Sequence, residues 1–351
     1  MSFEIPREIA ALAPSSDALD RLVYLIGPAR GGTSIIHRSM NVHPNTLVLP
    51  NVSYFMQRVW RYRNKVHERL LHDILRMPGF WDNNVLRSRL SEEQYSAHRQ
   101  LVNAALASRD LAPLYKLYPL TYALTGASGK DPGAVKVWHD KQNDWRYLDP
   151  LAKAFPKAKF IFVMRDPRSV ALSGSLRVSA KAGEVAEARK RDDVVNVALY
   201  WRFLSQRCLD FAKGYPGRAI FVRFEDFMTS PVETMNRVFS FTMDAPMEEA
   251  ALRVALATVR GGGTNVASEY TGVSTEPLAR WKESLGAREV DMIEALTAPT
   301  ARKLGYEIER RDGAFGMLRR LREVGGRAAA KALLCEGYDL KLGSVAAERP
   351  R

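Results

Sequence analysis

Short apolar runs separated by amphipathic stretches dominate the pattern along the chain. The runs occupy residues 22–27 (LVYLIG), 135–138 (VKVW), 159–164 (KFIFVM) and 219–224 (AIFVRF). Runs of this length are typical of strands that are buried on both faces of a parallel sheet. We therefore predict a strand at each of these four positions.

Stretches with helical spacing of apolar residues lie between these runs and after them. They span residues 33–42, 145–155, 168–180, 192–213 and 231–242. Strands that alternate with helices form a parallel sheet covered by helices on both faces. The predicted fold class is therefore α/β, a three-layer fold with a central parallel sheet flanked by helices.

Three segments depart from this alternation. Residues 52–125 are polar, aromatic-rich and helical in pattern, which predicts a helical insertion beside the sheet. Residues 261–280 are rich in glycine and predict a long loop, and loops of that length in a compact domain are often lids over a site. We expect one domain over residues 1–310 and a basic helical extension over 311–351. An amphipathic basic helix either docks on its domain or lies on an anionic membrane, and both remain open.

Composition limits the class of protein. Hydrophobic residues make up 46% of the 351 residues and charged residues 26%, which is ordinary for a globular chain. The net charge of +13 suits nucleic acid, an anionic membrane or a small polyanionic ligand. The chain has no basic apolar leader, no run of 18 apolar residues and only two cysteines, far apart. We therefore expect a cytoplasmic location, with the basic extension as the candidate membrane contact.

A glycine-rich segment, Gly27 to Ser34 (GPARGGTS), joins the first predicted strand to its helix. Its spacing is nearly that of a phosphate-binding P-loop, but Thr33 replaces the lysine. Glycines and a helix N-terminus offer backbone N–H groups, the hydroxyls add donors, and Arg30 adds a planar cation. We predict an anion site made of Arg30, Gly31, Gly32, Thr33 and Ser34. The missing lysine argues against an ordinary ATPase or kinase.

A second cationic group follows the strand predicted at 159–164. Arg165 comes directly after the strand, and Ser173 lies a little over two turns into the next helix. Ligands of open α/β sheets bind at the carboxyl ends of the strands. Arg165 and Ser173 therefore predict a second anion site at the same edge of the sheet.

Together, GPARGGTS and KFIFVMRDPRSVALS (159–173) resemble the PAPS-dependent sulfotransferase superfamily, in its bacterial and tyrosylprotein-type branch. PAPS is 3′-phosphoadenosine 5′-phosphosulfate. The resemblance implies a P-loop-like fold whose first loop binds the 5′-phosphosulfate, while Arg165 and Ser173 bind the 3′-phosphate. It implies sulfuryl transfer from PAPS to a hydroxyl, with PAP as the product and no metal.

Weaker matches extend the resemblance to roughly residues 20–310. The segment 222–227 (VRFEDF) resembles a later strand–turn of the family, V-x-[YF]-E-[DE]-L. The segments 277–281 (PLARW) and 304–306 (LGY) resemble the C-terminal end of tyrosylprotein-type and bacterial members. In that group the basic residue before the tryptophan reaches the nucleotide, which implies the same role for Arg280.

Sulfuryl transfer depends on positioning and on neutralising charge, and it needs a base for the acceptor. We nominate Arg30 and Lys141 as the cations, because Lys141 matches the lysine of a family strand-end motif whose proline is absent here. A solvated loop lysine is the alternative. His139 is our candidate base because an imidazole titrates near neutral pH, and Asp140 is the alternative. No cysteine, histidine and acidic cluster has metal-ligand spacing.

The acceptor is not specified by any motif. The Arg- and Ala-rich composition is typical of bacterial chains and favours a glycan, glycolipid or other small molecule over a protein tyrosine. A P-loop-type small-molecule kinase, or another nucleotide-binding enzyme, is the alternative function. We expect no nucleic-acid partner, because the chain lacks nucleic-acid-binding motifs and its basic residues are dispersed.

Overall fold

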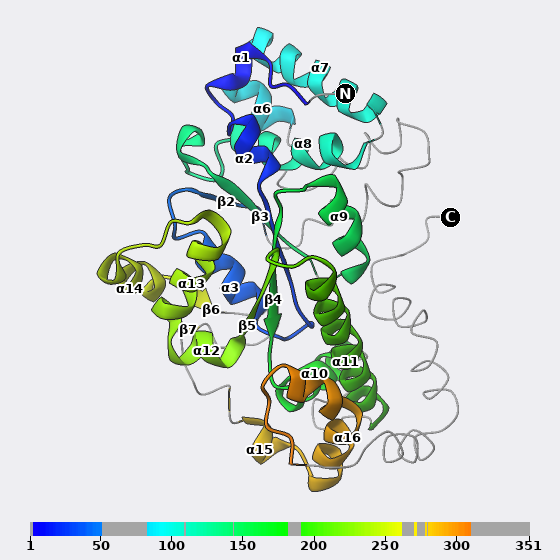
Figure 1. The fold of residues 1–351 in the computed structure, drawn as a ribbon. Helices are drawn as coiled ribbons and strands as arrows, with labels where there is room; N and C mark the ends of the chain where they lie inside the picture. Colours follow the sequence, from blue (N-terminus) through cyan, green and yellow to red (C-terminus); the bar gives the residue numbers. More distant parts are fainter. Residues whose placement is uncertain are drawn as a thin grey trace.

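The computed structural model describes residues 3–50, 83–108, 110–142, 144–181, 191–261, 270–271, 278 and 280–309. Its centre is a five-stranded parallel sheet with the strand order β2-β3-β1-β4-β5 (Figure 1). The strands are β1 (Leu22–Ile26), β2 (Thr46–Val48), β3 (Val137–Lys141), β4 (Lys159–Met164) and β5 (Ala219–Arg223). The predicted α/β class with a central parallel sheet is confirmed.

Two strand predictions need correction. β2 was not predicted, because three residues are too few to form a recognisable apolar run. β3 begins and ends later than predicted, since the polar residues His139, Asp140 and Lys141 continue the strand. All three are buried, because β3 lies between β1 and β2. They therefore belong to the strand itself and do not follow it.

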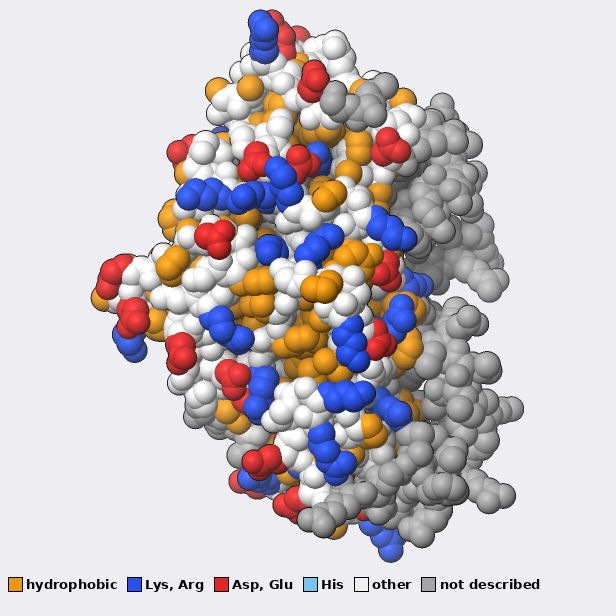
Figure 2. Space-filling model, viewed as in Figure 1, with side chains coloured by type: hydrophobic (Ala, Val, Ile, Leu, Met, Phe, Trp, Pro, Cys, Tyr) orange, Lys and Arg blue, Asp and Glu red, His pale blue; other side chains and the backbone are white. Residues whose placement is uncertain are grey.

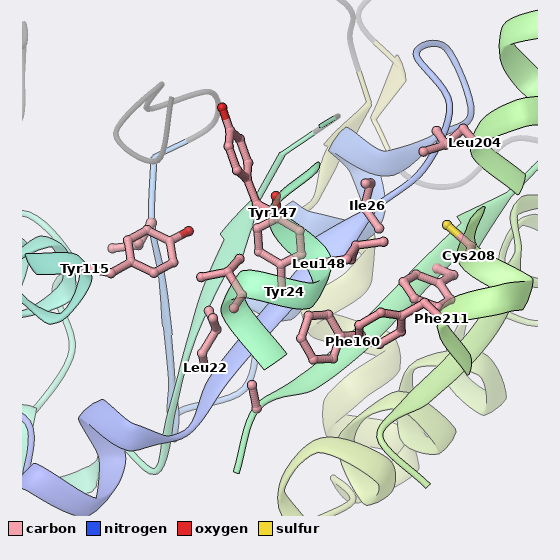
Figure 3. Packing of buried hydrophobic residues seen from close by; sticks show 14 of the residues in the cluster. Leu22, Tyr24, Ile26, Tyr115, Tyr147, Leu148, Phe160, Leu204, Cys208 and Phe211 are labelled. Atoms are coloured by element: carbon pink, nitrogen blue, oxygen red, sulfur yellow. The ribbon is translucent and has the colours of Figure 1, made fainter. Parts of the chain in front are cut away.

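Side chains alternate between the two faces of the sheet, as strand geometry requires. Tyr24 and Ile26 face a large apolar core that also contains Phe160, Cys208 and Phe211 (Figure 3). This core is closed by α8 (Leu111–Leu124), α9 (Leu148–Ala154), α10 (Pro167–Lys181), α11 (Arg191–Gly214) and α16 (Ala287–Lys303). Val23 and Leu25 face the second core, closed by α3 (Thr33–Met40), α12 (Phe224–Thr229), α13 (Pro231–Met243) and α14 (Glu249–Ala257). Helices thus cover both faces, and three layers result.

The remaining elements lie around this sandwich. Helices α1 (Arg7–Ala10), α2 (Ser16–Asp20), α6 (Asn83–Arg89) and α7 (Glu92–Ser108) gather with α8 at one end of the molecule (Figure 1). At the opposite end lies α15 (Arg280–Ser284), and β6 (Arg260–Gly261) pairs with β7 (Tyr270–Thr271). Two 3₁₀ turns, Pro132–Ala134 and Trp145–Tyr147, flank β3.

Several predicted segments fall wholly or partly outside the described residues. They are residues 52–82 of the predicted insertion, most of the predicted loop 261–280 and the whole basic extension 311–351. The described part of the insertion contains the helices α6 (Asn83–Arg89), α7 (Glu92–Ser108) and α8 (Leu111–Leu124). The lid and the basic extension stay predictions. Within the described ranges, no helix is long and apolar enough to cross a membrane.

Candidate active site

The glycine-rich turn lies at the carboxyl edge of the sheet, between the end of β1 and the start of α3. The Gly31 N–H donates to the Pro28 carbonyl at 2.8 Å and closes the turn. Gly32 precedes α3 with a left-handed φ of 85°, and a Cβ there would overlap the Phe224 ring. Gly32 is the N-cap residue and has no side chain with which to cap this helix start. Its first backbone N–H groups are therefore suited to hold an anion.

Arg30 lies within this turn in an uncommon backbone conformation. Its φ is 69°, in the left-handed region that L-residues seldom adopt. The Arg30 Nε donates to Ser173 Oγ on α10 at 2.9 Å. The turn after β1 is thereby joined to the helix after β4, so residues of the two predicted anion sites are in direct contact.

Lys141 approaches the turn from the neighbouring strand. It ends β3, where it pairs with Leu25 of β1, and its Nζ donates to Ser34 Oγ at 3.1 Å. The residue is only 4% exposed, so the alternative of a solvated loop lysine is wrong. Burial lowers its pKa from 10.5 to about 8. A cation thus reaches the turn from β3, whereas an ordinary P-loop carries its lysine at the position of Thr33.

Arg165 follows β4 directly, and β4 pairs with β1. An Nη of Arg165 donates to the Arg30 carbonyl at 3.1 Å. Its guanidinium carbon lies 4.7 Å from the centre of the Phe224 ring, and Trp201 Nε1 donates to the Arg165 carbonyl at 2.8 Å. Burial lowers the pKa of Arg165, but an arginine side chain keeps its charge in proteins. The second predicted anion site is therefore adjacent to the first.

A buried ion-pair network holds the C-terminal helices against this edge. Arg168 pairs with Asp166 at 2.7 Å and with Glu294 of α16 at 2.8 Å. Its guanidinium carbon also lies 4.1 Å from the centre of the Trp281 ring, in α15. Arg280 is the first residue of α15 and is exposed. The structure thus fixes the helix that carries Arg280 against α10, which carries Ser173.

The candidate base His139 lies deeper than expected. Its side chain is fully buried in β3 on the face covered by α3, and its ring centre is 6.0 Å from that of His37. Neither ring nitrogen has a hydrogen-bond partner among the described residues. Burial lowers the pKa of His139 well below 6.5, so the ring is neutral at pH 7. Its role as a base stays a prediction.

Asp140, the alternative base, faces the opposite core and is also fully buried. Its carboxylate accepts hydrogen bonds from the Tyr115 hydroxyl, from Gln142 Nε2 at 3.1 Å and from the Lys141 N–H at 2.9 Å. Burial raises its pKa. Tyr115 was not predicted as part of the site, because an aromatic residue inside a helix is usually only part of the core.

Phe224, Glu225 and Trp201 were also not predicted as part of the site. The first two belong to the motif VRFEDF, which the sequence marked without a role, whereas Trp201 carried no signal. Across the described ranges, no group of three or more His, Cys, Asp or Glu side chains is arranged to hold a metal ion.

The fold and the site place the chain in the class of P-loop-like α/β proteins, with a glycine-rich turn between the first strand and its helix. The chain belongs to the sulfotransferase family, whose family model matches residues 23–249. This match includes the glycine turn, Lys141, Arg165 and Ser173. The protein is therefore an enzyme, a sulfotransferase.

Individual relatives agree at low identity. Protein-tyrosine sulfotransferase 1 of Danio rerio is 23% identical over 295 residues, which cover 82% of this chain and 72% of the relative. Protein-tyrosine sulfotransferase of Drosophila melanogaster is 24% identical over 298 residues, covering 82% of this chain and about half, 52%, of the relative. The sulfotransferase domain of the Synechococcus PCC 7002 olefin synthase has a similar fold, with a TM-score of 0.51 and 15% identity. That alignment covers 88% of this chain and 99% of the domain.

Proposed function

We propose that this sulfotransferase takes PAPS as its donor and transfers the sulfuryl group to a hydroxyl of a glycan, glycolipid or other small molecule, releasing PAP. The observation that carries the proposal is that Arg30, in the first proposed anion site, contacts both residues of the second proposed site, Arg165 and Ser173. Its carbonyl accepts from Arg165 and its side chain donates to Ser173. PAPS carries its 3′- and 5′-anionic groups on one ribose, so two adjoining cationic sites suit it.

In this proposal the glycine turn and the residues after β4 bind different groups of PAPS. Backbone N–H groups at the start of α3, with the hydroxyls of Thr33 and Ser34, would hold the 5′-phosphosulfate. Arg165 and Ser173 would hold the 3′-phosphate, and Arg280 would approach from α15. Contacts within the protein already hold Ser34, Arg165 and Ser173, which limits the entropy lost on binding.

Arg30 and Lys141 are the proposed catalytic cations. PAPS supplies an activated sulfuryl group when it is bound. Lys141 reaches Ser34 at the start of α3, where a cation opposes the negative charge that develops on the leaving phosphate. Arg30 would hold the sulfuryl oxygens in line with the acceptor hydroxyl.

The base for the acceptor hydroxyl is proposed as His139, with Asp140 as the alternative. Both are fully buried, so the kinetic effect of each substitution decides between them. If His139 is the base, His139→Ala lowers turnover by about 10²–10⁴-fold. Near-normal turnover in that variant, together with a comparable loss in Asp140→Asn, assigns the role to Asp140.

Ligand-induced stabilisation tests the donor. We expect PAP to raise the melting temperature in a concentration-dependent way, because a ligand that binds only the folded state stabilises it by mass action. ATP with Mg²⁺ is expected to give no such shift. Strong stabilisation by ATP–Mg²⁺ and none by PAP contradicts the proposal and supports the kinase alternative.

A screen with PAPS labelled in its sulfuryl group tests the acceptor. Glycans, glycolipids, small hydroxylated metabolites and tyrosine peptides are compared with the same enzyme preparation. Transfer of label to one of the first three classes supports the proposal. Transfer only to the tyrosine peptide contradicts the proposed acceptor class but not PAPS as the donor.

No nucleic-acid partner is proposed. Figure 2 shows basic and acidic side chains interspersed over the displayed face.

A further inference from the structure

Two sequence motifs without a role in the proposed site meet in the structure. Glu225 of VRFEDF lies in the first turn of α12, and Tyr306 of LGY follows α16. The Tyr306 hydroxyl donates to Glu225 Oε2 at 3.1 Å, across 81 residues of sequence. Glu225 Oε1 accepts the backbone N–H of Asp166 at 2.9 Å. One carboxylate therefore connects the C-terminal segment to the chain just after β4.

Strand register brings these groups together. β5 pairs in parallel with β4, and Arg223 lies opposite Met164. Because parallel strands leave the sheet at the same edge, the residues after β5 lie beside those after β4. Phe224 packs under the Arg165 guanidinium, and Glu225 meets the backbone of Asp166.

Arg165 lies close enough to Glu225 for the carboxylate to affect its pKa. Burial lowers the pKa of the Arg165 guanidinium, and attraction to Glu225 opposes this shift. Burial raises the pKa of Glu225, while the hydrogen bond from the Asp166 N–H lowers it. Asp166 and Tyr306 also lie near this carboxylate, and the guanidinium carbon of Arg223 lies 4.7 Å from the centre of the Tyr306 ring.

We propose that Glu225, held by Tyr306, is a positioning residue that fixes Arg165 for the 3′-phosphate of the nucleotide. The carboxylate anchors the backbone next to Arg165. It touches no reacting group and acts through Arg165 alone. This inference rests on the proposed function, in which Arg165 binds the 3′-phosphate. PAP carries that phosphate and AMP lacks it.

Substitutions of Glu225 and Tyr306 distinguish the hydrogen bonds of the carboxylate from its charge. Glu225→Ala removes the acceptor for the Asp166 N–H and for the Tyr306 hydroxyl. Glu225→Gln keeps an oxygen acceptor and the size of the side chain but removes the charge. Tyr306→Phe removes only the hydroxyl. Asp226→Ala is the matched control, since Asp226 is the next carboxylate on the same helix and is exposed.

The experiment compares the binding of PAP and of AMP by titration calorimetry in each variant. Glu225→Ala is expected to weaken PAP at least about tenfold and AMP by less than about twofold, because only PAP carries the group that Arg165 binds. Glu225→Gln is expected to restore PAP binding to within about threefold of the wild type. Tyr306→Phe is expected to weaken PAP about threefold, and Asp226→Ala to leave both ligands unchanged.

The outcomes separate this inference from the proposed function. A wild-type protein that does not bind PAP overturns the proposed function and this inference with it. If the wild type binds PAP, an unchanged ratio of PAP to AMP affinity in folded Glu225→Ala overturns the inference alone. If Glu225→Ala does not fold, wild-type PAP affinity in Tyr306→Phe overturns it. Equal losses in Glu225→Ala and Glu225→Gln attribute the effect to charge and contradict anchoring.

Discussion

The Nε of Arg30 donates to the Oγ of Ser173 at 2.9 Å, although 143 residues separate them along the chain. Both side chains are proposed ligands of a nucleotide anion. A nucleotide bound as proposed would exchange this hydrogen bond for contacts to its own oxygens. The contact also places the turn after β1 and the helix after β4 on one binding surface, which gives the first prediction.

Arg165→Ala is expected to weaken PAP binding by about 1.5–3 kcal/mol, the usual contribution of a hydrogen bond to a charged group. That loss corresponds to roughly a ten- to hundredfold increase in Kd. Titration calorimetry with PAP measures it. Arg253→Ala is the matched control, since Arg253 is exposed on α14. Wild-type affinity in Arg165→Ala would exclude Arg165 from the phosphate site.

Gly32→Ala is expected to weaken PAP binding and to destabilise the fold by more than its backbone strain alone. Gly32 has a φ of 85°, and an added Cβ would overlap the Phe224 ring. Gly129 is the matched control, because its φ is 63° and an added Cβ meets no atom within 4 Å. Gly129→Ala should cost about 1–2 kcal/mol of unfolding free energy and leave PAP affinity unchanged. Equal costs in the two variants, measured by urea denaturation, would contradict the close approach of Phe224.

PAP affinity is expected to fall as the pH rises through about 8. Burial lowers the pKa of Lys141 to about 8, so in the free enzyme its ammonium is charged below that pH and neutral above it. The phosphates of PAP are already fully ionised near pH 8, since their second pKa is about 6. Calorimetry between pH 7 and 9.5 measures the change. Lys141→Arg should show no step in this range, because arginine keeps its charge. A step that persists in Lys141→Arg would assign it to another group.

Arg168→Ala is expected to destabilise the fold by about 3–5 kcal/mol, as the removal of one partner of a buried ion pair does. The substitution leaves the carboxylates of Asp166 and Glu294 without their cation, and both are largely buried. Adding Glu294→Gln to Arg168→Ala should recover part of the loss, because one uncompensated charge is removed. Urea denaturation of the two single variants and the double variant measures the coupling. Strictly additive effects would show that the pair contributes no coupling energy.

The sheet was largely predictable from sequence, because strands buried on both faces leave continuous apolar runs. β1, β4 and β5 appear where the runs at 22–27, 159–164 and 219–224 predicted them. β3 was misplaced since its last three residues are polar, and their burial depends on neighbouring strands that a sequence pattern does not reveal. β2 was missed because it has only three residues and because its burial likewise depends on pairing with β3.

Candidate site residues could be nominated from sequence where they come soon after a predicted strand. Arg165 follows β4 directly, and Arg30 and Ser34 lie in the turn and the first helical turn after β1, so the parallel pairing of β1 and β4 brings them to one edge of the sheet. Tyr115 and Trp201 reach the site from helix interiors, where their spacing indicates only core packing. The link between Glu225 and Tyr306 joins two marked motifs, but only the tertiary structure shows that they touch.

The fold is expected to lose stability as the pH falls below about 6.5, in part because of its buried histidines. Burial lowers the pKa of His37 to about 3, the pKa of His98 to about 4 and the pKa of His139 well below 6.5. Between pH 6.5 and these values the unfolded chain binds protons that the folded chain does not. Stability therefore decreases with falling pH in that window, and it is unaffected by these groups above it.

His37→Gln removes one of these titrations and tests the effect. In urea denaturation between pH 5.5 and 4.5, each neutral buried histidine costs about 1.4 kcal/mol per pH unit. The decrease in unfolding free energy should therefore be smaller in the variant by about that amount per unit. Near pH 8, where these histidines are neutral in both states, the difference in unfolding free energy between the two proteins should not change with pH. This separates the effect of the titration from any change in packing. If the unfolding free energies of the two proteins fall in parallel below pH 6, His37 is protonated in the folded protein. That result would contradict its burial as a neutral ring beside His139.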